Sequence, residues 1–262
     1  MPSRGDVAIV IPARNESDRI GATVKAAAGV PGADLIVVVD DGSQDDTAAV
    51  AQRAGASVVR HSRSHGKGAA LETGAEAVRL LEQKDDHSQR HYLLFLDGDL
   101  AESAGSGGAL VEPVRDGQAD MTIAVFTDRV RAGGHGFVVG LSGAGIKRAT
   151  GWSPAQPLNG QRCLTWAAFE AARPLAAGWG VETGLTIDLI RQGFRIAEVE
   201  VPMAHRATGT DWQAQWHRAR QFAGVARALA ARDPRAQAAW QALHRAKGAR
   251  RPAPKGARRR LD

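Results

Sequence analysis

The sequence has 262 residues, of which 44% are apolar, enough for one large domain with a substantial core. Its single cysteine, Cys163, excludes an intrachain disulfide and fits a reducing compartment. The polar stretch after Met1 lacks the apolar centre of a signal peptide, and no apolar run approaches the roughly 18 residues of a membrane span. We therefore expect a cytoplasmic protein.

The net charge of +6 is concentrated near the carboxyl terminus. Residues 244–262 hold eight of the 34 Lys and Arg residues and one of the 28 acids, so the rest is close to neutral. Such a segment is typical of tails that bind an anionic membrane or nucleic acid, and equally of solvated, disordered ends. We expect a disordered basic tail over 233–262 and no nucleic-acid partner, with peripheral contact at the inner membrane face as the alternative.

Strand and helix patterns alternate over the first 126 residues. Apolar or β-branched runs predict strands at 7–13, 33–43, 56–61, 93–96 and 119–126. Candidate caps Asn15 and Ser17 predict a helix to about Ala28, and further helices are expected within 43–55 and 64–83. This alternation, at about 25 residues per unit, predicts a mostly parallel sheet with helices on both faces.

The second half of the chain differs from the first in composition. Residues 129–152 are rich in glycine and arginine and predict loops and one helix beside the sheet. Further helices are expected at 165–176, 182–192 and 212–231, and a strand at 194–201. We therefore divide the chain into 1–126, 127–232 and the tail at 233–262.

Polar clusters follow the predicted strands at the points where they end. They are Asp40–Asp41, His65–Lys67 and Asp97–Asp99. In α/β sheets, ligands bind beyond the carboxyl ends of the strands. Two carboxylates separated by one glycine can hold Mg²⁺ or Mn²⁺ together with a substrate diphosphate, although such a stretch is often only a solvated turn.

Four strand-end motifs occur in order over the first hundred residues: VIPARNES, VVVDDGSQDDT, GKGAAL and LFLDGDL. Together they resemble the nucleotide-sugar half of family-2 glycosyltransferases with the GT-A fold. GWGVETGLTIDLI, VPMAHRATGTD and HRARQ extend the resemblance to about residue 222, toward glucosyl-3-phosphoglycerate synthases and polyprenyl-phosphate glucosyltransferases. The resemblance implies an α/β GT-A fold with a mostly parallel central sheet flanked by helices, whose two halves, 1–126 and 127–232, bind donor and acceptor.

The resemblance also implies a donor site. It places Glu16 against the ribose, Asp40 and Asp41 against the base or ribose, and Lys67 against the uracil edge or the diphosphate. The donor-binding residues it implies are Pro12, Ala13, Asn15, Glu16, Asp40, Asp41, Lys67, Asp97 and Gly98. The alternatives are ordinary helix-start or turn acids and, for Lys67, an exposed lysine in a flexible loop.

The same resemblance makes Asp97, Asp99 and His205 the ligands of a Mg²⁺ or Mn²⁺ ion. The candidate catalytic residues are Asp99 and Glu182. Glu182 would act as a general base or as an orienting group, the alternative being a helix-start acid. Gly98 stands where relatives carry a bulkier or small polar residue, which leaves the fine positioning of the two acids open.

The candidate acceptor residues gather in two later motifs. Arginine is suited to anionic acceptors because its guanidinium matches a phosphate or carboxylate. The residues are Asn159, Gly160, Gln161, Arg162, Arg206 and Arg218.

These residues lead to one principal hypothesis. It is metal-dependent transfer of glucose from UDP-glucose to a 3-phosphoglycerate-like or other small anionic acceptor. A polyprenyl phosphate is the alternative acceptor, and a non-catalytic nucleotide-binding module is the alternative class. The relatives' pattern favours a homodimer, and the sequence leaves inversion or retention open.

Overall fold

The computed structural model describes residues 6–84, 90–127, 136–203 and 212–233, and for 212–220 it describes the helical backbone alone. Within these residues one sheet of seven strands has the order β3-β2-β1-β4-β6-β5-β7. The strands are β1 (Val7–Ala13), β2 (Ala33–Asp40), β3 (Ser57–Arg60), β4 (Tyr92–Phe95), β5 (Met121–Phe126), β6 (Arg162–Leu164) and β7 (Ile196–Val201).

The sheet is mostly parallel, as predicted. Strand β6 runs antiparallel to β4 and β5, and the other strand pairs are parallel. The three residues of β6 escaped prediction because RCL contains neither an apolar run nor an alternation long enough to indicate a strand. By inserting between β4 and β5, β6 brings the 157–162 loop to the end of β4.

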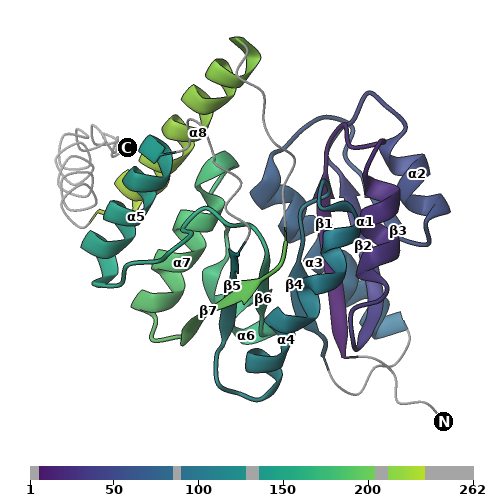
Figure 1. The fold of residues 1–262 in the computed structure, drawn as a ribbon, viewed down its shortest axis with the longest axis horizontal. Helices are drawn as coiled ribbons and strands as arrows, with labels where there is room; N and C mark the ends of the chain where they lie inside the picture. The colour runs from purple at the N-terminus through teal and green to yellow at the C-terminus, as the bar shows by residue number, and fades with distance from the viewer. Residues whose placement is uncertain (1–5, 85–89, 128–135, 204–211, 234–262) are drawn as a thin grey trace, which may run out of the picture.

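Helices cover both faces of the sheet (Figure 1). They are α1 (Ile20–Ala27), α2 (Thr47–Arg53), α3 (Lys67–Lys84), α4 (Gly108–Arg115), α5 (Gly136–Thr150), α6 (Trp166–Ala172), α7 (Val181–Arg191) and α8 (Trp212–Ala231), with 3₁₀ turns η1 (Ala101–Gly107) and η2 (Gly178–Gly180). Helices α5, α7 and α8 gather beyond the β7 edge (Figure 1).

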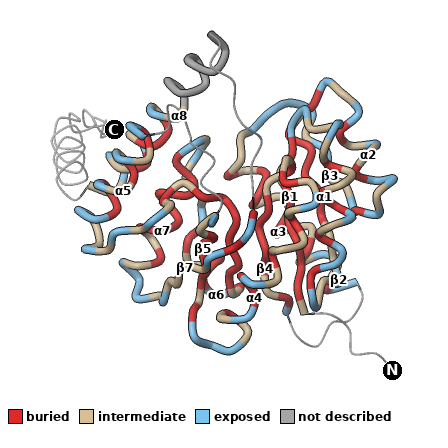
Figure 2. The backbone as a smooth tube through the Cα atoms, viewed as in Figure 1, coloured by how far each residue is buried: buried red, intermediate tan, exposed pale blue. Residues whose placement is uncertain are grey.

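Strand β1 divides the core into two layers. Val7, Ile9 and Ile11 pack into a cluster with residues of α1 and α4. Ala8 and Val10 face the opposite cluster, which includes residues of α3, α6 and α7. This alternation is the period-2 geometry of a strand, and both faces are buried because helices cover both (Figure 2).

One local prediction was wrong, and one helical segment was missed. Helix α1 begins at Ile20, and Asn15 adopts φ 56° instead of capping it; its backbone N–H and that of Ser17 bond to side chains of the 43–47 loop. The η1–α4 segment was missed because its glycines and Pro113 weaken the helical pattern. None of the described helices combines the length and the hydropathy that crossing a bilayer requires.

Candidate functional site

The candidate site lies at the carboxyl ends of the parallel strands. The loops that follow β1, β2, β3 and β4 leave the sheet at this edge and carry the predicted donor residues. The segment that leads into α7 reaches the same place, because Glu182 contacts Lys67. The structure thus brings together motifs that lie up to 170 residues apart in the sequence.

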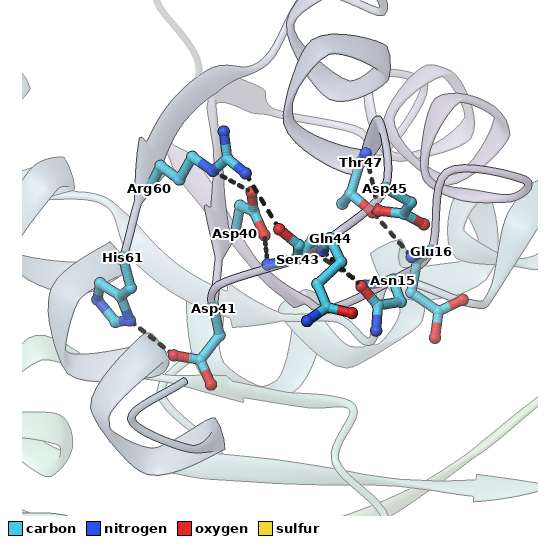
Figure 3. A network of polar contacts seen from close by, with 10 residues as sticks. All are labelled: Asn15, Glu16, Asp40, Asp41, Ser43, Gln44, Asp45, Thr47, Arg60 and His61. Atoms are coloured by element: carbon cyan, nitrogen blue, oxygen red, sulfur yellow. Dashed lines mark hydrogen bonds and ion pairs between the residues drawn. The ribbon is translucent and has the colours of Figure 1, made fainter. Parts of the chain in front are cut away.

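Hydrogen bonds join the loop after β1 to the loop after β2 (Figure 3). The backbone N–H of Asn15 donates to Ser43 Oγ at 2.9 Å, and Asn15 Oδ1 accepts from the Gln44 N–H at 2.9 Å. The backbone N–H of Glu16 donates to Thr47 Oγ1 at 2.8 Å. These side chains of the second loop therefore fix the course of the first.

Asp45 completes this junction. Its carboxylate accepts from the Ser17 N–H at 3.2 Å and from the hydroxyl and N–H of Thr47. Burial would raise the pKa of Asp45, but the hydrogen bonds from Thr47 and Ser17 outweigh it and lower the pKa to about 2. The carboxylate is therefore part of the loop scaffold.

Asp40 and Asp41 have different surroundings. Asp40 is fully buried; its Oδ1 accepts from the Ser43 N–H at 2.9 Å, and Arg60 Nε lies 3.1 Å from its Oδ2. Asp41 is also buried and accepts from His61 Nδ1 at 2.7 Å (Figure 3). Burial would raise the pKa of Asp41, but four hydrogen bonds, led by that of the His65 N–H, lower it to about 2.

Three charged side chains meet beyond the carboxyl end of β4. They are Lys67, Asp97 and Glu182, and we call them the charge cluster. Lys67 Nζ lies 2.6 Å from Asp97 Oδ1 and 2.9 Å from Glu182 Oε1. Lys67 is the first residue of α3, Asp97 follows β4, and Glu182 lies in the first turn of α7. Side chains from three elements therefore share one point at the edge of the sheet.

The charge cluster is partly open to solvent. The side chains of Lys67 and Asp97 are 22% and 23% exposed, and that of Glu182 is 8% exposed. Burial would lower the pKa of Lys67, but the charges of Asp97 and Glu182 outweigh it and raise the pKa above its usual value. One ammonium thus faces two carboxylates at a position that solvent reaches.

The loop before β6 contacts the charge cluster and helps to hold it in place. Gln161 is fully buried, and its Nε2 donates to Asp97 Oδ2 at 2.9 Å, which leaves Oδ1 to Lys67. A Cβ on Gly160 would lie 2.2 Å from Lys67 Nζ and 3.0 Å from Asp97 Oδ2, so a larger residue would displace the lysine. Two predicted acceptor residues therefore contact donor-side groups in this structure.

Thr23 on α1 holds the loop of Asp97 and Asp99, which we call the acid pair, and no pattern in the sequence predicts this role. Its buried hydroxyl donates to the Gly98 carbonyl and accepts from the Ala101 N–H, both at 2.8 Å. Ala101 has φ 48°, an uncommon conformation that these bonds help to maintain. Gly98 lies against Pro12 and Ala13, since a Cβ there would be 3.2 Å from the Ala13 Cβ.

Arg162 and Asn159 form hydrogen bonds with neighbouring groups of the protein. Arg162 is 1% exposed and donates to the Asn159 carbonyl at 3.0 Å and to Thr186 Oγ1 at 2.9 Å. Burial lowers the pKa of Arg162 to about 10, against the opposing effect of nearby acids. The Asn159 amide bonds to Gln156 and to the Gln161 N–H. Both side chains thus bond to neighbouring protein groups, and their assignment to the acceptor stays a prediction.

Several predicted residues lie outside the described part of the chain. They are His205 and Arg206, together with the side chain of Arg218 in α8. Among the residues that are described, no three His, Cys, Asp or Glu side chains gather closely enough to hold a metal ion. The predicted ligand set of Asp97, Asp99 and His205 remains a prediction.

Comparison with known proteins agrees with this arrangement. The family model described as glycosyl transferase family 2 matches residues 8–164. Glycosyltransferase AglJ of Haloferax volcanii is 31% identical over 215 residues, which cover 80% of this chain and 67% of AglJ. The glucosyl-3-phosphoglycerate synthase of Mycolicibacterium paratuberculosis is 28% identical over 205 residues, covering 70% of this chain and 59% of the synthase.

Comparison with solved structures supports the same fold. The glucosyl-3-phosphoglycerate synthase of Mycobacterium tuberculosis, in complex with Mn²⁺, UDP-glucose and phosphoglyceric acid, superposes with a TM-score of 0.69 at 25% identity. The match covers 88% of this chain and 80% of that one.

The fold and the strand-end site define a nucleotide-sugar-dependent glycosyltransferase with a GT-A-like fold. The chain belongs to glycosyl transferase family 2 and is related to glucosyl-3-phosphoglycerate synthases.

Proposed function

We propose that the protein transfers glucose from UDP-glucose to a small anionic acceptor resembling 3-phosphoglycerate, with the help of Mg²⁺ or Mn²⁺. The charge cluster is the observation that carries this proposal. It offers a donor and two acceptors of hydrogen bonds at one partly exposed point beside the acid pair. Sugar hydroxyl groups both donate and accept, so a hexose suits this position.

In this proposal residues 1–126 bind the donor, and the linked loops after β1 and β2 receive the nucleoside. Asn15 and Glu16 belong to the first loop, Asp40 ends β2, and Pro12 and Ala13 lie against Gly98 of the acid pair. The loops are held by hydrogen bonds in the structure itself, so little ordering cost remains for binding.

The acid pair suits a divalent cation. Carboxylate oxygens are the donors that Mg²⁺ and Mn²⁺ prefer, and a protein often supplies only two of them beside substrate phosphates. Asp97 already holds a positive group, Lys67 Nζ, at 2.6 Å. In our proposal Asp97 and Asp99, with His205, hold the ion. A bound ion would neutralise charge on the departing diphosphate.

In our proposal Glu182 lies on the acceptor side of the transferred sugar. Its Oε1 is 2.9 Å from Lys67 Nζ, which holds the carboxylate in place. We propose that Glu182 accepts a proton or a hydrogen bond from the acceptor hydroxyl. Lys67 orients Glu182 and Asp97 together, while Gln161 Nε2 holds the second oxygen of Asp97.

Residues 127–232 form the acceptor half in this proposal. The described residue Arg162 is buried and bonds both to its own loop and to α7. In this proposal an anionic acceptor therefore depends on Arg206 and Arg218. The structure of the M. tuberculosis synthase with phosphoglyceric acid supports such an acceptor. A polyprenyl phosphate is the second candidate, and peripheral membrane contact through the basic tail and a homodimer remain predictions.

A donor and acceptor screen tests the proposal. The full chain is incubated with UDP-glucose and Mn²⁺ or Mg²⁺, with 3-phosphoglycerate or a short polyprenyl phosphate, and the product is identified by mass spectrometry. We expect a glucosyl adduct of 3-phosphoglycerate and none in Glu182→Gln. An adduct of the lipid alone would transfer the proposal to the second candidate. Binding of UDP without transfer to any acceptor would favour the non-catalytic module.

A further inference from the structure

The carboxylate of Asp41 is surrounded by hydrogen-bond donors from residues 61–66. His61 Nδ1 and the His65 N–H donate to Oδ1 at 2.7 and 2.8 Å, and the Ser64 hydroxyl and the Gly66 N–H donate to Oδ2 at 2.7 and 2.9 Å. The side chain is 7% exposed. Both oxygens therefore accept two hydrogen bonds each, which is close to the capacity of a carboxylate.

These bonds reach the start of α3. The N–H groups of His65 and Gly66 immediately precede Lys67, the first residue of that 18-residue helix. N–H groups at a helix start have no partner within the helix, and a carboxylate is favoured there by the helix dipole. Asp41 thus serves α3 as a cap supplied from the end of β2.

His61 extends the same contact deeper into α3. With its Nδ1–H donating to Asp41, its Nε2 is left to accept from the Thr73 hydroxyl at 3.0 Å. Thr73 lies six residues after Lys67 on the helix. The end of β3, the end of β2 and the first two turns of α3 are therefore tied through one carboxylate.

The first turn of α3 is also fixed from the opposite side. A Cβ on Gly68 would lie 2.6 Å from the Ala176 carbonyl oxygen, and Glu72 Oε1 accepts from the Leu175 N–H at 2.6 Å. This segment leads to Glu182. Lys67 therefore starts from a turn that is enclosed between Asp41 and the chain that delivers its second carboxylate partner.

We propose that Asp41 is a positioning residue that sets the place of Lys67 in the charge cluster. It acts through the backbone N–H groups of His65 and Gly66 and through the Ser64 hydroxyl, and His61 holds Asp41 in turn. The proposal deepens the proposed function, on which its catalytic consequence rests. Its structural part, the placement of the Lys67 amine, stands independently of any reaction.

The first test measures that placement without turnover. The Asp41→Asn variant keeps the size of the side chain but turns an amide group toward N–H donors. Lysine labelling with acetic anhydride, followed by mass spectrometry, reports the reactivity of Lys67, with exposed Lys25 as the internal reference. We expect Lys67 to label several-fold faster in Asp41→Asn, and at the wild-type rate in Asp45→Asn, whose carboxylate bonds to other loops.

The milder variant Ser64→Ala keeps the test informative if Asp41→Asn does not fold. It removes one of the four bonds and should raise Lys67 labelling in the same direction, by less. Unchanged Lys67 labelling in the folded variants would overturn the proposal.

The second test is a double-mutant cycle on transfer. If Asp41 acts through Lys67, Asp41→Asn lowers kcat at saturating UDP-glucose at least tenfold in the wild type and by less than twofold in a Lys67→Met background. Fully additive losses, or a loss of UDP affinity with kcat unchanged, would show that Asp41 does not act through Lys67 and would overturn the proposal. Absence of transfer by the wild type would contradict the proposed function while leaving the labelling result to decide the placement.

Discussion

Asp41 and Asp97 both follow buried parallel strands, yet their surroundings differ. Asp41 accepts four hydrogen bonds from residues 61–66 of its own half of the chain and is 7% exposed. Asp97 is 23% exposed, and its partners Lys67, Gln161 and, through Lys67, Glu182 come from three other elements. The first carboxylate belongs to the scaffold, whereas the second lies where a ligand can replace its partners.

This difference predicts two kinds of mutational effect, one on stability and one on transfer. Changes in the linked loops after β1 and β2 should act on stability first, because their polar groups bond to one another. Changes in the charge cluster should act on transfer first, because its groups are partly exposed and compensate one another's charge.

The largest effect is expected for Asp97→Asn. The amide removes the charge that faces Lys67 and the divalent ion, so transfer from UDP-glucose should fall about 100-fold or more. Steady-state kinetics with UDP detection measures it. Asp120→Asn, which removes a charge paired with exposed Arg195, is the matched control and should leave transfer unchanged. A loss of less than threefold in Asp97→Asn would place Asp97 with the scaffold.

Arg162→Ala tests the acceptor half. The change leaves the Asn159 carbonyl and the Thr186 hydroxyl without their buried partner, so the free energy of unfolding should fall by about 3 kcal/mol. Urea unfolding measures it, with Arg195→Ala, whose ion pair with Asp120 is exposed and should matter far less, as the comparison. An unchanged unfolding midpoint with a raised KM for the acceptor would instead return Arg162 to the acceptor site.

A smaller, pH-dependent effect is expected for Asp45→Asn. The hydrogen bonds from Thr47 and Ser17 outweigh burial and lower the pKa of Asp45 from 3.8 to about 2, so its ionised form stabilises the folded state by about 2 kcal/mol. This contribution is complete above the unfolded pKa and is lost as pH falls through about 2. Unfolding at pH 7 and at pH 2 should therefore show a wild-type advantage only at pH 7. An equal advantage at both values would contradict the assignment.

Most of the fold was readable from the sequence because most of its strands are apolar or β-branched runs, of which β1 and β4 are buried on both faces. Strand β6 was not, since three residues carry no period, and its place in the sheet is decided by tertiary pairing. The strand-end acids were found because the apolar runs that precede them were recognised as strands.

The contacts within the site could not be predicted. Spacing placed Lys67, Asp97 and Glu182 at strand and helix ends, but their meeting at one point depends on the packing of α3 against the segment before α7. Thr23 gave no signal, because a threonine inside a helix is ordinary until the loop it holds is known. Gln161 was assigned to the acceptor from its loop, whereas its bond to Asp97 depends on β6 lying beside β4.

We propose that the acids after β4 hold the donor's diphosphate together with a divalent ion. Isothermal titration of UDP into the full chain, with and without Mn²⁺, examines this binding without turnover, with Asp99→Ala measured in parallel. We predict that Mn²⁺ tightens UDP binding at least tenfold in the wild type and has no such effect in Asp99→Ala. Equal UDP affinity in all four titrations would contradict the claim.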